Sequence, residues 1–470
     1  MLKGKTKIEL TDVNTGEVEV IEKENMVTNA LQYIFKPMGF VKAGSLWFTN
    51  EFVAYYKTLT GGLLLLNKPL EENPDNLYLP ANVEQVGCAV YNKQNDSQKT
   101  LRGSFNATET EVDVANRKVK YVYDFTTAEG NGTIESIALT HAFGGYSNRG
   151  LNDAPVRGEY PFFKGIGSGL LYYTGTESHI GAYDRTSSYS TYGTGTQWIF
   201  KIDATIDSVY YFCITSNSSI KIRRYRANLH TISLFDLPGY TRTLLEETEI
   251  TFTQTVSQQY FSYYYDDETD KLYIFSANSY YVSNNGSYLV TEIDMANDCA
   301  VTQYPMTNKC GASMRICQDS RGDIVCYRGY LYFANYGYGV TRYIYRQELG
   351  NSPNAQRIDV AIRDSNPILA RNGFVYFEYP SSYSGTYCLY VVNAETFTFK
   401  YPESYALCDS VDRHFIPVKG YPLTYYASKG SNTGTFVICT DYLATINNLE
   451  RPVTKTPDKT MKITYTLTEQ

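Results

Sequence analysis

Short runs of aromatic and β-branched residues recur along the second half of this sequence. Each run opens on a hydrophobic residue followed by Tyr or Thr, and the intervals between openings average roughly the 40 to 50 residues of one four-stranded propeller blade. A turn and a second run follow, as in "SYLVTEID" and "TYCLYVVN". The runs are nearly continuous, which indicates strands buried on both faces. The six opening pairs are Leu171-Tyr172, Val209-Tyr210, Leu272-Tyr273, Leu331-Tyr332, Val375-Tyr376 and Leu423-Thr424.

This repetition predicts a β-propeller head over residues 165–450. A few strands with two apolar faces are not stable alone, because each face needs a neighbour, and stacking in a ring supplies one on both sides. We therefore expect about six blades, with each opening run and the run after it forming the two middle strands of a blade. The alternative is a pair of stacked β-sandwich domains in which the spacing is coincidental.

The first 150 residues have a different pattern, that of a compact β-rich domain. Alternating residues in "KTKIELTDVNTGEVEVIEKEN" predict a hairpin around "NTG". Apolar residues four apart in "NMVTNALQYIF" predict one short helix that ends before Pro37. Further strands are expected in "GCAVYN", "SFNATETEVDV", "KVKYVYDFTT" and "GTIESIALTH". We assign residues 1–150 to this domain and the Gly-, Pro- and Asn-rich residues 151–164 to a linker.

The C-terminal residues 451–470 resemble the first domain in pattern. After Pro452 and Pro457, a strand with one buried and one exposed face is predicted by the alternation of Met461, Ile463, Tyr465 and Leu467 with Lys and Thr. We expect this strand to return and pair with the N-terminal domain, preceded by a linker. The fold class expected is thus all-β, with the propeller inserted into the N-terminal domain.

Composition excludes several classes of partner. The formal net charge is -7, whereas a nucleic-acid-binding protein needs basic faces. No stretch approaches the ~18 apolar residues of a membrane span, and the first residues lack the apolar core of a signal peptide. The 9 cysteines form no C-x-x-C pair and are interpreted as buried free thiols, in keeping with synthesis in a reducing cytoplasm.

The sequence carries no recognisable catalytic or cofactor motif. The 4 His have no zinc-ligand spacing, and neither a phosphate-binding loop nor an esterase nucleophile motif occurs. We therefore predict no catalytic residue, no cofactor, no metal and no enzyme. One acidic turn, "DDETD" at 266–270, is either a calcium site or a polar hairpin. Carboxylates distant in sequence can also meet in space, so a surface-polysaccharide depolymerase stays open as an alternative.

Several loops of the predicted propeller alternate Tyr with Ser, Gly, Asn and Thr, as antibody binding surfaces do. Tyr provides rigid contact area, and small polar residues provide adaptable hydrogen bonds. Turns in general also favour Gly, Ser and Asn, so the same composition fits plain hairpins. The candidate ligand-binding residues are Tyr183, Tyr189, Tyr192, Tyr280, Tyr281, Tyr336, Tyr338 and Tyr383.

Three segments near the ends resemble the end segments of tail-associated structural proteins of bacteriophages and prophages that infect Gram-positive, Clostridium-like bacteria. They are "TKIELTDVNTGEVEVIEKENMVTNAL", "VYDFTTAEGNGTIESIALTHAFGGY" and "YLATINNLERPVTKTPDKTMKITYTLTE". The resemblance covers roughly the first 150 and the last 30 residues. It implies that the ends attach to the particle and that the middle faces the host.

The function expected from this resemblance is a virion structural protein of the tail-fibre or receptor-binding type. It would be made in the host bacterial cytoplasm and located in the virion as a homo-oligomer. Its partners would be other tail or baseplate proteins, through the N-terminal domain, and a host surface glycan or protein, through the propeller loops. The non-adhesive alternative is a structural collar, fibre or capsid-decoration protein.

Overall fold

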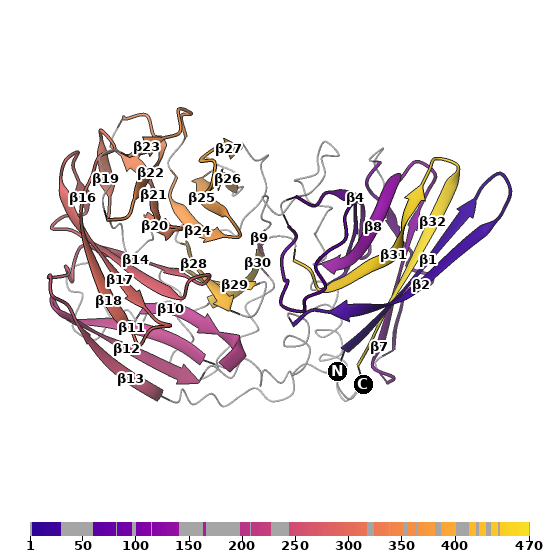
Figure 1. Ribbon diagram of the computed structural model, residues 1–470, viewed down its shortest axis with the longest axis horizontal. Coiled ribbons are helices and arrows are strands. Elements are labelled where there is room, and N and C mark those ends of the chain that lie inside the picture. Colours follow the sequence, from indigo (N-terminus) through magenta and orange to yellow (C-terminus); the bar gives the residue numbers. More distant parts are fainter. Residues whose placement is uncertain are drawn as a thin grey trace.

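The computed structural model has two β-rich bodies side by side, with both ends of the chain in the same one (Figure 1). Strands and turns make up nearly all of it, so the all-β class is confirmed. It describes residues 2–29, 60–80, 82–95, 100–113, 115–140, 163–165, 198–206, 208–226, 244–316, 324–337, 339–350, 355–362, 365–380, 387–400, 413–419, 423–428, 434–439 and 442–469.

The predicted N-terminal hairpin is formed by β1 (Leu2–Asp12) and β2 (Val18–Val27), which pair antiparallel. Alternate residues of β1 are buried, because its period-2 side chains face the interior on one side only. The segment predicted to form a short helix after the hairpin begins as a strand. Residues 25–27 continue β2, Asn29 is helical, and residues 30–59, which include the remainder of the predicted helix, lie outside the described residues.

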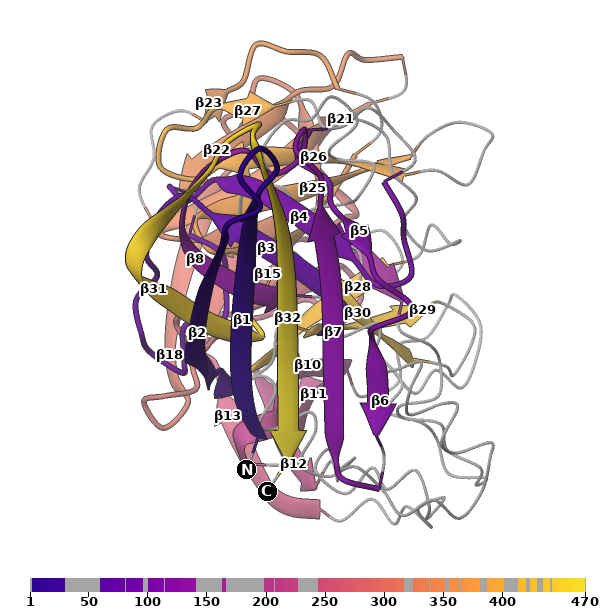
Figure 2. The same ribbon diagram turned by 90° about the vertical axis from the view of Figure 1, so that its right-hand side faces the viewer.

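The predicted C-terminal strand is β32 (Lys459–Glu469), and it lies between β1 and β7 (Lys118–Phe125). It pairs antiparallel with both over most of its length. Figure 2 shows β2, β1, β32 and β7 side by side. The return to the N-terminal domain is therefore confirmed, and β32 is a central strand of that domain.

The return begins earlier than expected. Strand β31 (Thr445–Lys455) pairs with β2 and β8 (Gly132–Thr140), so residues 445–450 belong to the N-terminal sheet and not to the propeller. Pro452, expected in a linker, lies inside β31 where the register with β8 shifts between Asn448 and Val453. A bulge tolerates proline because the ladder hydrogen bond is already missing there.

The described strands of the N-terminal sheet number ten, in the order β4-β3-β8-β31-β2-β1-β32-β7-β5, with β6 paired to β7. Backbone bonds join its two ends, since Cys88 N donates to Leu101 O at 2.7 Å and Gly103 N donates to Cys88 O at 2.8 Å. The sheet is thus nearly closed around its apolar interior. The remaining strands are β3 (Gly62–Leu66), β4 (Gln85–Val90), β5 (Ser104–Phe105) and β6 (Glu111–Asp113).

The second body is a β-propeller, and its described strands form five four-stranded blades. From the innermost strand outward, the first blade is β10 (Trp198–Asp203), β11 (Ser208–Ser216), β12 (Ser219–Arg226) and β13 (Leu244–Thr251), and the second is β14 (Phe261–Asp266), β15 (Lys271–Ser276), β17 (Ser287–Asp294) and β18 (Ala300–Thr307). The third blade is β20 (Ile324–Tyr327), β21 (Tyr330–Tyr336), β22 (Ile344–Glu348) and β23 (Gln356–Arg357), and the fourth is β24 (Pro367–Arg371), β25 (Phe374–Pro380), β26 (Tyr387–Asn393) and β27 (Phe399–Lys400). The fifth is β28 (Arg413–Lys419), β29 (Leu423–Ser428), β30 (Gly434–Cys439) and β9 (Phe163–Gly165).

The five innermost strands contact one another in a closed ring. β10 contacts β14, β14 contacts β20, β20 contacts β24 and β24 contacts β28. The ring is closed by the parallel pairing of β28 with β10. The fifth blade takes its outermost strand, β9, from the N-terminal side of the propeller. This exchange ties the two ends of the propeller together and leaves only short edges.

The opening pairs of the sequence repeat lie on the second strand of each blade: β11, β15, β21, β25 and β29. The runs after them form the third strands, so the prediction of paired middle strands is confirmed in these five units. The described ring has one blade fewer than the six units counted. The run that follows the pair Leu171-Tyr172 in the sequence, "TQWIFKID", contains β10, which is the innermost strand of the first blade and not the third strand of a blade of its own. The pair itself lies outside the described residues.

The two bodies share apolar contacts. Buried residues of the N-terminal sheet form one cluster with residues of β10, β11 and β28. In addition, the Arg371 guanidinium lies 5.0 Å from the centroid of the Tyr78 ring. The propeller is therefore packed against the domain that carries the chain ends (Figure 1).

Candidate functional site

Three of the eight candidate tyrosines lie in the described part of the chain, and the fold brings them together. Tyr280 and Tyr281 precede and begin β16 (Tyr281–Val282), and Tyr336 ends β21. Tyr280 is 36% exposed and Tyr281 is 44% exposed. The other five fall outside the described residues: Tyr183, Tyr189, Tyr192, Tyr338 and Tyr383.

Two short strands that extend the sheet of the third blade bring Tyr281 and Tyr336 together, although these residues are 55 positions apart in the sequence. Tyr281 pairs with Arg315 across β16 and β19 (Ser313–Arg315), and Ser313 pairs with Tyr336 across β19 and β21. Because neighbouring strands lie about 4.8 Å apart, side chains on one face of such a sheet are in contact.

The rings of Tyr281 and Tyr336 are stacked, with centroids 4.7 Å apart and planes 10° apart. Two guanidinium groups approach Tyr336, with Arg315 Cζ 3.9 Å and Arg342 Cζ 4.8 Å from its ring centroid. The residue before Tyr281, Tyr280, contacts Tyr260 edge to face, with ring centroids 4.6 Å apart. We call Tyr260, Tyr280, Tyr281, Arg315, Tyr336 and Arg342 the tyrosine-arginine cluster.

A buried amide holds the loop that carries two residues of this cluster, Tyr336 and Arg342. Asn335 is 2% exposed. Its Nδ2 donates to Thr341 O at 3.0 Å, and its Oδ1 accepts from Tyr343 N at 2.6 Å. These bonds close the loop between Tyr336 and Arg342, so both side chains are presented from a fixed backbone.

Sequence reasoning missed Arg315, Arg342, Asn335 and Tyr260. Arg342 stands in the Tyr-rich loop "ANYGYGVTRY", so the loop itself contained a signal for it. Arg315 stands in "ASMRIC", which has no such composition. Only the pairing of β16 with β19 places it beside Tyr281.

Cationic neighbours also change the acidity of the cluster. Hydrogen bonds from Tyr281 and Arg315 lower the pKa of Tyr336, whereas the bond to Tyr336 raises the pKa of Tyr281. The cluster combines flat aromatic faces, phenolic hydroxyls and cations. That set suits a ligand with exposed C-H faces and many oxygen atoms, as in a saccharide.

The acidic turn at 266–270 connects β14 to β15 and contacts other blades. Lys201 Nζ of the first blade donates to Asp270 Oδ1 at 2.6 Å, and Tyr327 Oη of the third donates to Glu268 Oε2 at 2.7 Å. Arg371 Nη2 of the fourth lies 3.1 Å from Asp267 Oδ2. Its carboxylates thus bind cationic and hydroxyl groups of the protein, which supports the polar-hairpin interpretation over calcium.

Among the residues that the structure describes, no group of three or more His, Cys, Asp or Glu is arranged to hold a metal ion. The described cysteines are free thiols: Cys88, Cys213, Cys310 and Cys326 are buried and Cys299 is half-buried. In the same part of the chain, no helix has the length and apolar character needed to cross a membrane.

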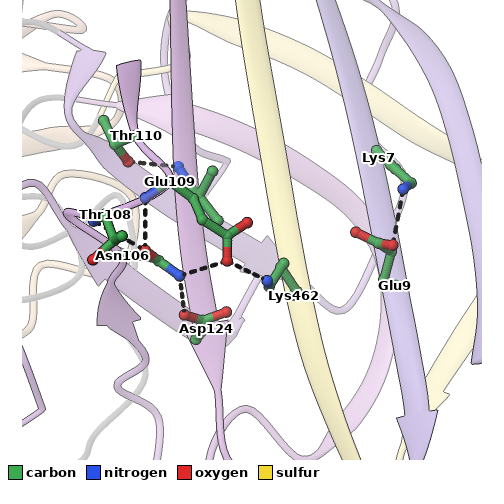
Figure 3. Close-up of polar contacts among 9 residues, drawn as sticks. Lys7, Glu9, Asn106, Thr108, Glu109, Thr110, Asp124 and Lys462 are labelled. Carbon is green, nitrogen blue, oxygen red and sulfur yellow. Dashed lines mark hydrogen bonds and ion pairs between the residues drawn. The ribbon is translucent and has the colours of Figure 1, made fainter.

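Charged and polar side chains on the outer face of the N-terminal sheet pair with one another around β1, β32 and β7 (Figure 3). Lys462 Nζ on β32 donates to Glu109 Oε1 at 2.5 Å, and Lys7 Nζ donates to Glu9 Oε1 at 2.8 Å on β1. Asn106 Nδ2 donates to Asp124 Oδ2 at 2.8 Å. This part of the face offers hydrogen-bonding groups, and the neighbouring strand β2 adds the exposed side chains of Val18 and Val20.

No protein-family model matches this sequence, and a search of curated proteins found no match. Solved structures similar to the chain include the β-propeller domain of the Trilobed protease from Pyrococcus furiosus, at 10% identity, a TM-score of 0.26 and coverage of 74% of this chain and 82% of that one. TolB from Acinetobacter baumannii is 12% identical, with a TM-score of 0.28 and coverage of 77% and 79%. Zg3597, a family 117 glycoside hydrolase from Zobellia galactanivorans, is 9% identical, with a TM-score of 0.28 and coverage of 61% and 91%. At this level of similarity, their activities do not transfer to this chain.

Proposed function

We propose that this protein is a phage virion structural protein of the tail-fibre or receptor-binding type, and that its propeller attaches to a host cell-surface molecule, a glycan in our interpretation. The observation that carries the proposal is the exposed Tyr281 ring, stacked on Tyr336 beside two arginines, on a head inserted into a separate β domain. The resemblance of the chain ends to phage tail proteins supports a role for that domain in attachment to the particle.

Binding by this cluster would depend on contact area and on copy number. A stacked pair of rigid rings loses little conformational freedom when it binds, and the half-buried Arg342 adds hydrogen-bond donors beside the pair. Arg315 is 7% exposed and supports Tyr336 from within the protein. One such surface gives modest affinity. Several copies on one particle multiply it, because the second contact is made at high effective concentration.

The N-terminal domain would hold the protein on other virion proteins. The propeller lies between β8 and β31 in the sequence and both strands belong to this sheet, so a pull on the head reaches the domain at two points, the end of β8 and the start of β31. Two connections restrict tilting of the head more than one linker does. The polar face of Figure 3 is a surface on which tail or baseplate proteins could dock by hydrogen bonds and ion pairs.

The test uses the full chain, multimerised on fluorescent beads and mixed with Clostridium-like Gram-positive cells. We expect the beads to bind, purified wall carbohydrate to compete, and the Tyr281→Ala variant to bind less. Absence of binding even on dense beads would overturn the adhesive role in favour of a structural one. Release of reducing ends from the carbohydrate would instead support a depolymerase, and antibody labelling of particles would locate the protein in the virion.

A further inference from the structure

Lys455, the last residue of β31, is a buried amine without a charged partner in the described part of the chain. Lys455 is 1% exposed. Its Nζ donates one hydrogen bond, to Asn131 Oδ1 at 2.8 Å. A buried ammonium normally needs a carboxylate and several acceptors, because burial removes its hydration. One neutral amide is a poor substitute.

The partner amide is held in place from both sides. Asn131 lies in the turn between β7 and β8, and its Nδ2 donates to Thr127 O at 2.9 Å. The next residue, Gly132, pairs with Lys455 in the ladder of β8 and β31. The hydrogen bond to Oδ1 keeps the amine within roughly 3–4 Å of the amide carbon.

A carboxylate shares the same turn. Glu129 is 8% exposed, its Oε1 accepts from Asn95 Nδ2 at 2.7 Å, and its Oε2 accepts from Thr126 N at 2.9 Å. Burial lowers the pKa of Lys455 to about 8, although the charges of Glu129 and Asp458 oppose the shift. The neutral amine, which is the nucleophilic form, is thus well populated at mildly alkaline pH.

We propose that Lys455 and Asn131 join in an intramolecular amide bond. The Nζ lone pair attacks Asn131 Cγ, the bond from Cγ to Nδ2 breaks, and the proton lost by Nζ leaves on the departing nitrogen as ammonia. No oxidant or reductant takes part, and the chain loses one molecule of ammonia. We assign Glu129 as a positioning residue, because its two oxygens accept hydrogen bonds that hold the turn carrying Asn131.

This bond would change how the two bodies are connected. Residues 131 and 455 lie on opposite sides of the propeller in sequence, so the amide would enclose the whole propeller in a covalent loop. A force on the head would then reach a covalent link between β31 and the turn before β8 instead of ladder hydrogen bonds alone. The inference is independent of what the propeller binds.

Intact-mass measurement of the full chain, purified and held at pH 9, tests the proposal. We expect a mass lower than that of the sequence by one ammonia, and a branched peptide containing Asn131 and Lys455 after digestion. In a second assay, cleavage within the propeller should leave the terminal fragments joined on a denaturing gel. The proposal would be overturned if the folded protein kept the mass of its sequence after prolonged incubation and if the two terminal fragments separated on the gel.

Two variants separate the reaction from its surroundings. Lys455→Arg keeps a charged donor but cannot form the amide, so it should keep the sequence mass, whereas the matched Lys5→Arg on the exposed face should still lose ammonia. Glu129→Gln removes a charge that disfavours the neutral amine. It also replaces one of the two oxygens that accept the hydrogen bonds of the turn by an amide nitrogen, so the loss of positioning should slow the reaction at every pH. An equal or faster rate would show that Glu129 does not position the turn.

Discussion

Leu2 and Glu469 lie opposite each other on the paired strands β1 and β32, at the two ends of the same chain. Strand β32 is also paired with β7 on its other side. The N-terminal domain therefore cannot complete its sheet until the whole propeller has been synthesised. Its folding is coupled to that of the last residues of the chain.

Removal of residues 459–470 should unfold the N-terminal domain. The deletion takes away four buried side chains, Met461, Ile463, Tyr465 and Leu467. At roughly 1.5–3 kcal/mol each, their burial is comparable with the ~5–15 kcal/mol that stabilises a typical domain. Limited proteolysis should cut this variant throughout residues 1–140. Thr466→Ala, on the outer face of the same strand, is the control and should resist cleavage like the parent. Protection of the truncated domain from cleavage would contradict a central role for β32.

Much of the propeller was predictable because burial on both faces leaves a local signature. The opening pairs found in the sequence lie on the second strands of the blades, where neighbouring blades cover both faces. Closure was not predictable, because β9 pairs with β30, which lies far along the chain. Strand β31 was missed for a related reason: its register shift interrupts the alternation that would have marked it.

The candidate site was predictable in composition but not in geometry. Tyr281 and Tyr336 were found from the Tyr-rich loops that contain them. Their stacking depends on the two-residue strand β16 and the three-residue strand β19, which are too short to have a periodicity of their own. Arg315 enters the cluster only through that pairing, so its role could not be inferred from its neighbours in the sequence.

Replacement of Arg371 by Met should destabilise the propeller. Arg371 and Asp267 form an ion pair whose side chains are only 4% and 14% exposed. Loss of one partner leaves a buried charge uncompensated, at a cost of about 3–5 kcal/mol. Arg371→Met combined with Asp267→Asn should cost less than the first change alone. Chemical denaturation measures both, with Lys5→Met of the exposed pair Lys5 and Glu22 as a control near zero.

Asp266→Asn should stabilise the propeller at pH 7.5 and have little effect at pH 4. Burial, with the charge of Asp267, raises the pKa of Asp266 from 3.8 to about 6. Between these values the folded state holds a proton that the unfolded state has lost, so stability falls as the pH rises through this window. The expected gain above pH 6 is about 3 kcal/mol.

Asp12→Asn provides a control of opposite sign. Backbone hydrogen bonds from Thr15 and Asn14 lower the pKa of Asp12, so its charged form favours folding and its replacement should reduce stability at pH 7.5. Denaturation curves at the two pH values check both variants. Equal stability of Asp266→Asn and the parent at pH 7.5 would show that the buried carboxylate is not a source of destabilisation.

Tyr281→Ala should reduce binding of the multimerised chain to host cells, by about 2 kcal/mol per site if the ring is a central contact. Tyr336→Ala should have a similar effect, and the two losses should not add, because each ring supports the other in the stacked pair. Tyr304→Ala, a half-buried tyrosine on the outer strand β18, should bind like the parent. Binding isotherms on immobilised wall carbohydrate give all four values; additive losses, or an equal loss in the control, would show that recognition lies elsewhere on the head.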